Sequence, residues 1–368
     1  MLRRFVPIAL ACAAPALGAQ SIFNTGARVA PQFHSYKIES PTNTTISEFS
    51  IPLFVVVPVT SRLSFDVGTS YASSRVEQTS GTSKVTSEIS GLTDTQIRGN
   101  LVLGNDFVIL TAGVNLPTGQ AEVLVDQQVA ASLIGSDFLA FPISNMGMGL
   151  GGTGGIAMAR PVGNWSLGLG LSMRRMAEYE PFSTGSIGSK RYQPGNEYRG
   201  RIGLERPVGT GRFMVGLTYS TFGNDELGGS IYNTGDRYMS QLDFTTDVGP
   251  GRILVTGWNL FRTRGTLADS SFLDHENISN GALAYAIPVG SSMVLEPNVQ
   301  GRTWLQPGAQ TSYMGTFGLR LQVGSGAFAF LPSAGYSIGQ IAASDPVVGV
   351  NTTASMTGFH ASLAIRVR

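Results

Sequence analysis

The stretch Pro161–Ser172, PVGNWSLGLGLS, joins a tight turn to an alternating strand. Glycine supplies the positive φ of a two-residue turn, and proline fixes φ beside it. Beyond the turn, Trp165 and each second residue are apolar while Ser166 and its alternates are small or polar, which indicates a strand with two different faces. The turn phrase returns, with spacings of 34 to 46 residues, in Pro207–Gly211, Asp247–Gly251, Pro288–Ser292 and Gln322–Gly326. This repetition predicts an all-β fold, an antiparallel up-and-down transmembrane β-barrel.

The first residues have the pattern of an export signal. Arg3 and Arg4 form a basic start, Phe5–Ala14 is apolar, and Leu17–Ala19 is a small-residue cleavage site. We therefore expect a signal peptide over residues 1–19, with a cut after Ala16 as the alternative. Residues 20–368 are then expected to form a single barrel domain.

Composition favours the same architecture. Charged residues make up 13% of the chain, there are 47 glycines, and the mean hydropathy is +0.11. The longest internal apolar run, Ile51–Val59, holds two prolines and is far shorter than the roughly 20 residues of a membrane helix. A closed barrel is the remaining way for an exported apolar chain to satisfy its backbone in lipid, so the predicted location is the outer membrane and the first partner its lipid. A net charge of +1 gives no reason to expect a nucleic-acid partner.

The turns also predict the number of strands. The five phrases, together with Pro58–Arg62 and Leu103–Phe107, make seven tight connections and therefore fourteen strands. A first strand at Arg28–Ile38 and a last one at Thr357–Val367 bring the total to about sixteen, an even number. Fourteen is the alternative, if the first segment folds inside as a plug. Aromatic residues predict two girdles, one near the turns (Phe107, Trp165, Phe213, Phe328) and one near the loops (Tyr71, Tyr198, Tyr219, Tyr238, Tyr313, Tyr336).

The polar strand faces predict a water-filled lumen, because a barrel of this size encloses an aqueous channel. The expected pore-lining residues carry both signs of charge: Asp66, Gln96, Arg98, Asn100, Arg199, Arg201, Glu205, Gln241, Asp243, Glu296, Arg302, Arg320 and Arg366. Each of them has a structural alternative, an arginine and carboxylate ladder that holds the wall in shape. The long loop from Thr118 to Met148 contains a possible helix, Ala121–Ile134, and apolar residues that we expect at a constriction in or over the mouth: Val125, Val129, Leu133, Phe138 and Phe141. The alternative is a loop that packs on its neighbours without a role in transport.

Motifs for catalysis or metal binding are weak. Gly335–Gly339 fits the nucleophile-elbow pattern around Ser337, but it ends a strand and enters a polar loop instead of a helix. The three histidines, among them His360, have no neighbouring His or Cys at metal spacing. We therefore expect no enzyme activity, metal or cofactor, and a hydrolase that uses Ser337 with His360 is the least favoured alternative.

Two short stretches resemble the outer-membrane transporters of hydrophobic compounds, which include the long-chain fatty acid transporter type and the aromatic-degradation pathway type. These are Ser90–Asp94, with Leu101–Leu103 after it, and Gly113–Gly119, whose Leu-Pro-Thr-Gly ending matches the family pattern; Thr93 replaces an expected glycine. The resemblance implies a channel for passive diffusion of small solutes, hydrophobic or aromatic ones included, and assigns no ligand residue. A structural or adhesive barrel with a closed lumen is the alternative, and the sequence does not indicate an oligomeric state.

Overall fold

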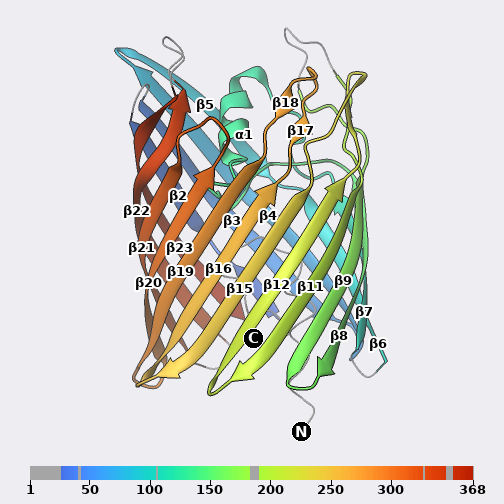
Figure 1. The fold of residues 1–368 in the computed structure, drawn as a ribbon, viewed down its shortest axis with the longest axis vertical. Coiled ribbons are helices and arrows are strands. Elements are labelled where there is room, and N and C mark those ends of the chain that lie inside the picture. Colours follow the sequence, from blue (N-terminus) through green and yellow to red (C-terminus); the bar gives the residue numbers. More distant parts are fainter. Residues whose placement is uncertain are drawn as a thin grey trace.

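The computed structural model describes residues 26–39, 43–104, 107–182, 190–325, 328–344 and 351–367, so the predicted signal peptide lies outside the described residues. The main sheet is a closed antiparallel barrel of 16 strands, as the sequence predicted (Figure 1). Its segments are β1 (Gly26–Val29), β2 (Gln32–Glu39), β3 (Asn43–Pro58), β4 (Leu63–Ser80), β5 (Ser83–Leu92), β6 (Thr95–Leu103), β7 (Val108–Leu116), β8 (Gly151–Val162), β9 (Trp165–Met176), β11 (Glu197–Val208), β12 (Gly211–Phe222), β15 (Arg237–Val248), β16 (Gly251–Arg262), β19 (Glu276–Val289), β20 (Met293–Leu305), β21 (Ser312–Ser325), β22 (Phe328–Ser344) and β23 (Asn351–Val367).

Two of the sixteen wall strands are interrupted. β1 and β2 form one strand broken at Ala30 and Pro31, and both halves pair with β3 on one side and β23 on the other. β5 and β6 form another, broken at Thr93 and Asp94, and both pair with β4. The first segment therefore lies in the wall and closes the barrel against the last strand, so the fourteen-strand alternative with an internal plug is wrong.

The seven tight connections all lie at one end of the barrel, called here the turn end; the opposite end is the loop end (Figure 1). Gly163, Gly209, Gly249 and Gly290 have φ between 56° and 67°, the left-handed region that glycine enters without strain. The fifth phrase differs, because β21 continues through its glycine to Ser325, which pairs with Phe328. Residues 326–327, like residues 105–106 at another connection, lie outside the described part of the chain.

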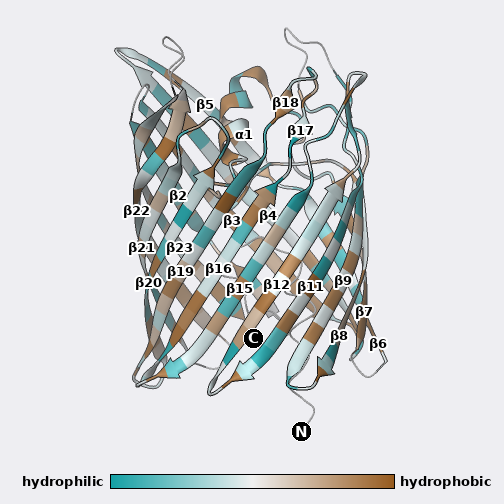
Figure 2. Ribbon diagram, in the orientation of Figure 1, coloured by the Kyte–Doolittle hydropathy of each residue, from teal (hydrophilic) through white to brown (hydrophobic). Residues whose placement is uncertain are grey.

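The two faces of the wall differ as the alternation predicted (Figure 2). Large apolar side chains, such as Leu171 and Phe317, are exposed around the outside of the barrel. The two predicted aromatic girdles are present on this face. Trp165 packs edge-on against Phe213 near the turn end, with ring centroids 6.3 Å apart, and Tyr219 lies 4.9 Å from Tyr238 near the loop end. An apolar belt between aromatic girdles is the surface that lipid covers in a membrane barrel.

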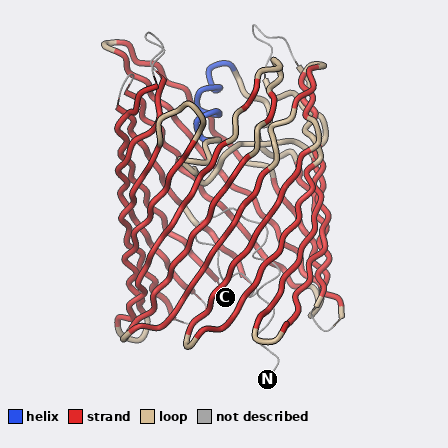
Figure 3. Tube along the Cα trace, in the orientation of Figure 1, coloured by secondary structure: helices blue, strands red, loops and turns tan. Residues whose placement is uncertain are grey.

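Irregular structure gathers at the loop end (Figure 3). Two small sheets stand there, β10 (Tyr192–Gln193) with β13 (Asp225–Leu227) and β14 (Ser230–Tyr232), and β17 (Gly265–Thr266) with β18 (Phe272–Leu273). The long loop between β7 and β8 holds a 3-10 turn, η2 (Val125–Gln127), and one helix, α1 (Gln128–Ile134). The predicted helix over Ala121–Ile134 was therefore too long at its start. Within the described ranges, no helix is long and apolar enough to cross a membrane.

Candidate functional site: the lumen and its inner loop

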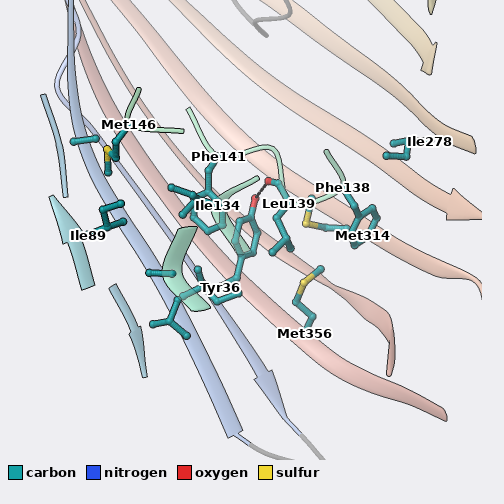
Figure 4. Packing of buried hydrophobic residues seen from close by; sticks show 14 residues of the cluster. Tyr36, Ile89, Ile134, Phe138, Leu139, Phe141, Met146, Ile278, Met314 and Met356 are labelled. Atoms are coloured by element: carbon teal, nitrogen blue, oxygen red, sulfur yellow. Dashed lines mark hydrogen bonds between the residues drawn. The ribbon is translucent and has the colours of Figure 1, made fainter. Parts of the chain in front are cut away.

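The long loop enters the barrel and packs on the inner wall. Phe138 and Leu139 are almost completely buried, and they join Ile134 and Phe141 in an apolar cluster with wall side chains (Figure 4). The Phe138 ring stacks on Trp304 of β20, with centroids 5.7 Å apart. Burial of such side chains contributes about 1.5–3 kcal/mol each, so the loop is a fixed part of the interior.

Four wall side chains also hold the loop through its backbone. The Tyr36 hydroxyl donates to the Leu139 carbonyl (3.1 Å), and the buried Glu48 carboxylate accepts from the Ile143 amide (2.9 Å). Ser87 accepts from the Ala130 amide at 3.1 Å and donates to the loop as well. Arg302, which is 3% exposed, donates to the Phe138 carbonyl. These bonds satisfy loop groups that would otherwise be buried without a partner.

Asp94 fastens the two ends of the loop to each other. Its Oδ1 accepts from the Gly119 amide (3.1 Å), and its Oδ2 accepts from the Met148 amide (2.6 Å) and from Asn115 Nδ2 (2.8 Å). A Cβ on Gly119 would lie 2.0 Å from the Met146 carbonyl oxygen, so only glycine fits there. The two stretches that carry the family resemblance therefore meet in space and form the base of the loop.

The loop occupies one side of the lumen. The wall residues that pack with it in the described cluster come from β2–β5, β16 and β19–β23, and none comes from β6–β15. On the β6–β15 side, much of the inner face is glycine, including Gly168, Gly170, Gly203 and Gly216, which line a shallow hollow with Arg201. Because the described cluster has no member from these strands, we call the inner face of β6–β15 the open lane. At the loop end the long loop also reaches the segment that follows β9, where the Val123 amide donates to the Pro181 carbonyl (2.9 Å).

The open lane is rich in arginine. Strand register places six arginines and four carboxylates on this face: Arg98, Arg174, Arg199, Arg201, Arg212, Arg237, Glu197, Glu205, Asp243 and Asp247. Glu197 contacts both Arg174 (3.1 Å) and Arg199 (2.5 Å), and Glu205 lies 3.6 Å from Arg212. The pairs Arg174–Glu197 and Glu205–Arg212 tie neighbouring strands together, whereas Arg199 and Glu197 belong to the same strand. The lane keeps an excess of positive charge.

The remaining expected pore-lining residues also lie on the inner face. Asp66 accepts from Asn100 (2.9 Å), Gln241 donates to Asp243 (2.8 Å), and Glu296 pairs with Arg320 (2.5 Å). Gln96, Arg98 and Arg366 have inward register positions. Arg302 differs from the other residues because it does not face open lumen: it is buried beneath the loop and holds that loop in place.

The five loop residues expected at a constriction fall into two groups. Phe138 and Phe141 are buried in the cluster, and Leu133 is packed against it. Val125 and Val129 are 60% and 38% exposed, and they face away from the cluster at the loop end. The control of passage by these residues stays a prediction. Sequence reasoning missed Tyr36, Glu48 and Asp94 as anchors. For Glu48, the signal that could have been used is a single acidic residue on the inward face of β3, between Ile46 and Ser50.

The catalytic alternative has no support in the local geometry. Ser337 lies in the middle of β22, where its hydroxyl shares a hydrogen bond with Thr316 (2.8 Å). The strand continues to Ser344, so the prediction that Gly335–Gly339 ends a strand and enters a loop was wrong. His360 stacks on His34, with ring centroids 5.5 Å apart, over a glycine of β22. In the described part of the chain, no three His, Cys, Asp or Glu side chains are grouped so that they could hold a metal ion.

No known family model matches the chain, and no curated protein is similar to it. Solved structures with similarity include an outer-membrane channel from Pseudomonas putida F1, with 11% identity, a TM-score of 0.40, and coverage of 96% of this chain and 99% of that one. An anion-selective porin from Comamonas acidovorans has 11% identity, a TM-score of 0.44, and coverage of 94% and 99%. A mutant monoaromatic hydrocarbon channel has 10% identity, a TM-score of 0.46, and coverage of 93% and 90%. The fold assignment rests on the strand pairing described above.

Proposed function

We propose that the protein is an outer-membrane channel through which small solutes diffuse passively along the open lane. The observation that carries the proposal is the one-sided packing of the loop: in a closed barrel of sixteen strands, the described apolar cluster of the loop packs against one arc of wall, from β16 through β23 to β5. A wall with exposed polar and charged groups beside that loop stays hydrated, as a diffusion path requires. The turn end then faces the periplasm and the loop end faces the outside.

The charge of the lane sets the expected selectivity. The inner face of the lane carries six arginines and four carboxylates, so small anions are favoured over cations by electrostatic attraction in a hydrated passage between low-dielectric walls. Val125 and Val129, exposed at the loop end, offer contact to solutes with an apolar part. Both features support a channel for small solutes of mixed character, apolar ones included.

Planar-bilayer recording of the refolded protein tests the proposal. We expect stable single-channel conductance in KCl, and a reversal potential in a KCl gradient that indicates chloride preference. Deletion of residues 120–145, which removes the loop between its Asp94-bound ends, is expected to increase the conductance. Absence of conductance at every voltage in the intact protein would favour the structural or adhesive barrel with a closed lumen.

A further inference from the structure

Two arginines lie directly opposite each other at the loop end of the barrel, where the open lane borders β16. Arg237 begins β15 and Arg262 ends β16, and the Cα atoms of the two are register partners whose side chains lie on the inner face. β15 and β16 are neighbours in the wall (Figure 1). The strand ends are held together just beyond them, because the Thr263 amide donates to the Asp236 carbonyl (2.9 Å) and the Asp236 amide donates to Thr263 Oγ1 (2.8 Å). Like charges at opposed positions of a strand pair destabilise the sheet, and here the chain cannot relax by separating the strands.

The carboxylates nearby neutralise only one member of this pair. Glu276 is bound to Arg262 (3.1 Å) and also accepts from Trp304 Nε1 (3.0 Å). The Asp236 carboxylate accepts from the hydroxyl of Tyr219 (2.8 Å). Tyr219 belongs to the aromatic girdle near the loops, on the outside of the barrel, so the carboxylate of Asp236 points away from the lumen. Among the described residues Arg237 makes no ion pair; its guanidinium lies 5.7 Å from the centre of the Phe222 ring.

Arg262 also carries an unused donor. Its Nε is buried and has no hydrogen-bond partner, and the side chain as a whole is only 16% exposed. Buried donors without partners are rare, and a bound ion or ligand is one explanation for such a donor. Arg199, the next arginine along this row, has its Nε and Nη2 committed to Glu197 and Ser220 and adds a third positive charge beside the pair.

We propose that Arg237 and Arg262 form a binding subsite for an oxyanion, the carboxylate or phosphate group of a solute entering the lane. The two guanidiniums lean to opposite sides, Arg262 toward Glu276 and Arg237 toward Phe222. An oxyanion in the lane would draw the two side chains together, accept from Arg262 Nε once that donor turns toward the lumen, and accept from the fork of Arg237. Arginine pairs bind planar and tetrahedral oxyanions through paired, charge-assisted hydrogen bonds. This subsite rests on the proposed channel, because it selects solutes at the entrance of that path.

Anion-dependent thermal unfolding of the refolded barrel tests the subsite without relying on conductance. A ligand that binds only the folded state raises the unfolding temperature in a saturable way. Sodium acetate and sodium phosphate are compared with sodium chloride at equal ionic strength, in the parent protein and in Arg237→Gln. Arg212→Gln is the matched control, since it removes the same charge from the same lane at the turn end, where Arg212 is paired with Glu205.

We expect acetate, phosphate or both to raise the unfolding temperature of the parent protein and of Arg212→Gln, and to leave Arg237→Gln without the saturable part of the increase. Arg237→Lys keeps the charge but loses the fork, so its apparent dissociation constant should rise about tenfold. A response to acetate alone assigns a carboxylate solute, and a response to phosphate alone assigns a phosphorylated one. Equal responses in the parent and Arg237→Gln would overturn the subsite. KCl conductance of the same preparations reports on the channel separately, so failure of one proposal is distinguishable from failure of the other.

Discussion

Replacing Asp94 should release the inner loop at its base. The carboxylate accepts three hydrogen bonds, one on Oδ1 from Gly119 and two on Oδ2 from Asn115 and Met148. An asparagine has one acceptor oxygen, so Asp94→Asn keeps at best the two bonds on one side and turns an amide N–H₂ toward the Gly119 amide. A hydrogen bond to a charged group contributes about 1.5–3 kcal/mol, so we expect the loop base to lose about 2 kcal/mol.

A loss of this size raises the equilibrium constant for local opening roughly 30-fold. Amide hydrogen exchange of the peptide that spans residues 117–150, followed by mass spectrometry in detergent, measures that change directly. Asp94→Ala removes all three bonds and should accelerate exchange further. Asp137→Asn is the matched control, because Asp137 is an exposed residue of the same loop. Unchanged exchange at Gly119 and Met148 in Asp94→Asn would refute the role of Asp94 as the fastening between the loop ends.

Three further predictions concern the inner loop and the small sheet at the loop end. Phe138→Ala removes a fully buried ring and should lower the free energy of unfolding by about 3–5 kcal/mol and increase the conductance. Val129→Ala, at an exposed site, is the control and should change the free energy of unfolding by less than about 0.5 kcal/mol. Thermal unfolding measures the stability, and bilayer recording measures the conductance. Gly119→Ala forces a Cβ against the Met146 carbonyl and should accelerate loop exchange, unlike Gly154→Ala, where nothing lies within 4 Å. Burial raises the pKa of Asp225 above 3.8, so its contribution to the stability of the β10–β13–β14 sheet is complete below about pH 4 and is lost as the pH rises through the pKa of the folded state. Amide exchange across residues 190–232, corrected for intrinsic rates, should therefore become faster as the pH rises, and this pH dependence should be absent in Asp225→Asn.

The wall of the barrel could be predicted because its rules are local. A glycine in the turn and a period of two after it determine where each strand begins and which face it presents, and the pattern around Trp165 was sufficient for that. The break in the first strand at Pro31 was not predicted. Whether a proline interrupts a strand depends on which strands pair with it, and the sequence alone does not show these partners. The phrase around Gly324 predicted the connection correctly but placed it slightly early, because β21 continues to Ser325, which pairs with Phe328 at the start of β22.

The contents of the lumen were less predictable, because they depend on contacts between distant residues. Inward register identified the charged residues but not their partners, so Arg302 was expected to line the pore and instead holds the loop, whose contacting residue Phe138 lies 164 positions earlier. Val125 and Val129 were grouped with Leu133 by helical spacing, but the helix buries Ala130 and Ile134 against the wall. Which side of a short helix packs inward is decided by the wall it meets, and that wall is formed by strands far away in the chain.

The one-sided placement of the loop also gives the barrel two mechanically different halves. From β16 through β23 to β5, the wall is backed by a dense apolar filling that resists compression. Across β8, β9, β11 and β12, inward glycines such as Gly203 and Gly216 leave the wall one backbone layer thick, held by ladder hydrogen bonds and the pressure of surrounding lipid. Lateral compression or thinning of the bilayer should therefore deform this barrel in a fixed direction. The half formed by β8, β9, β11 and β12 should bend, while the half backed by the loop keeps its shape.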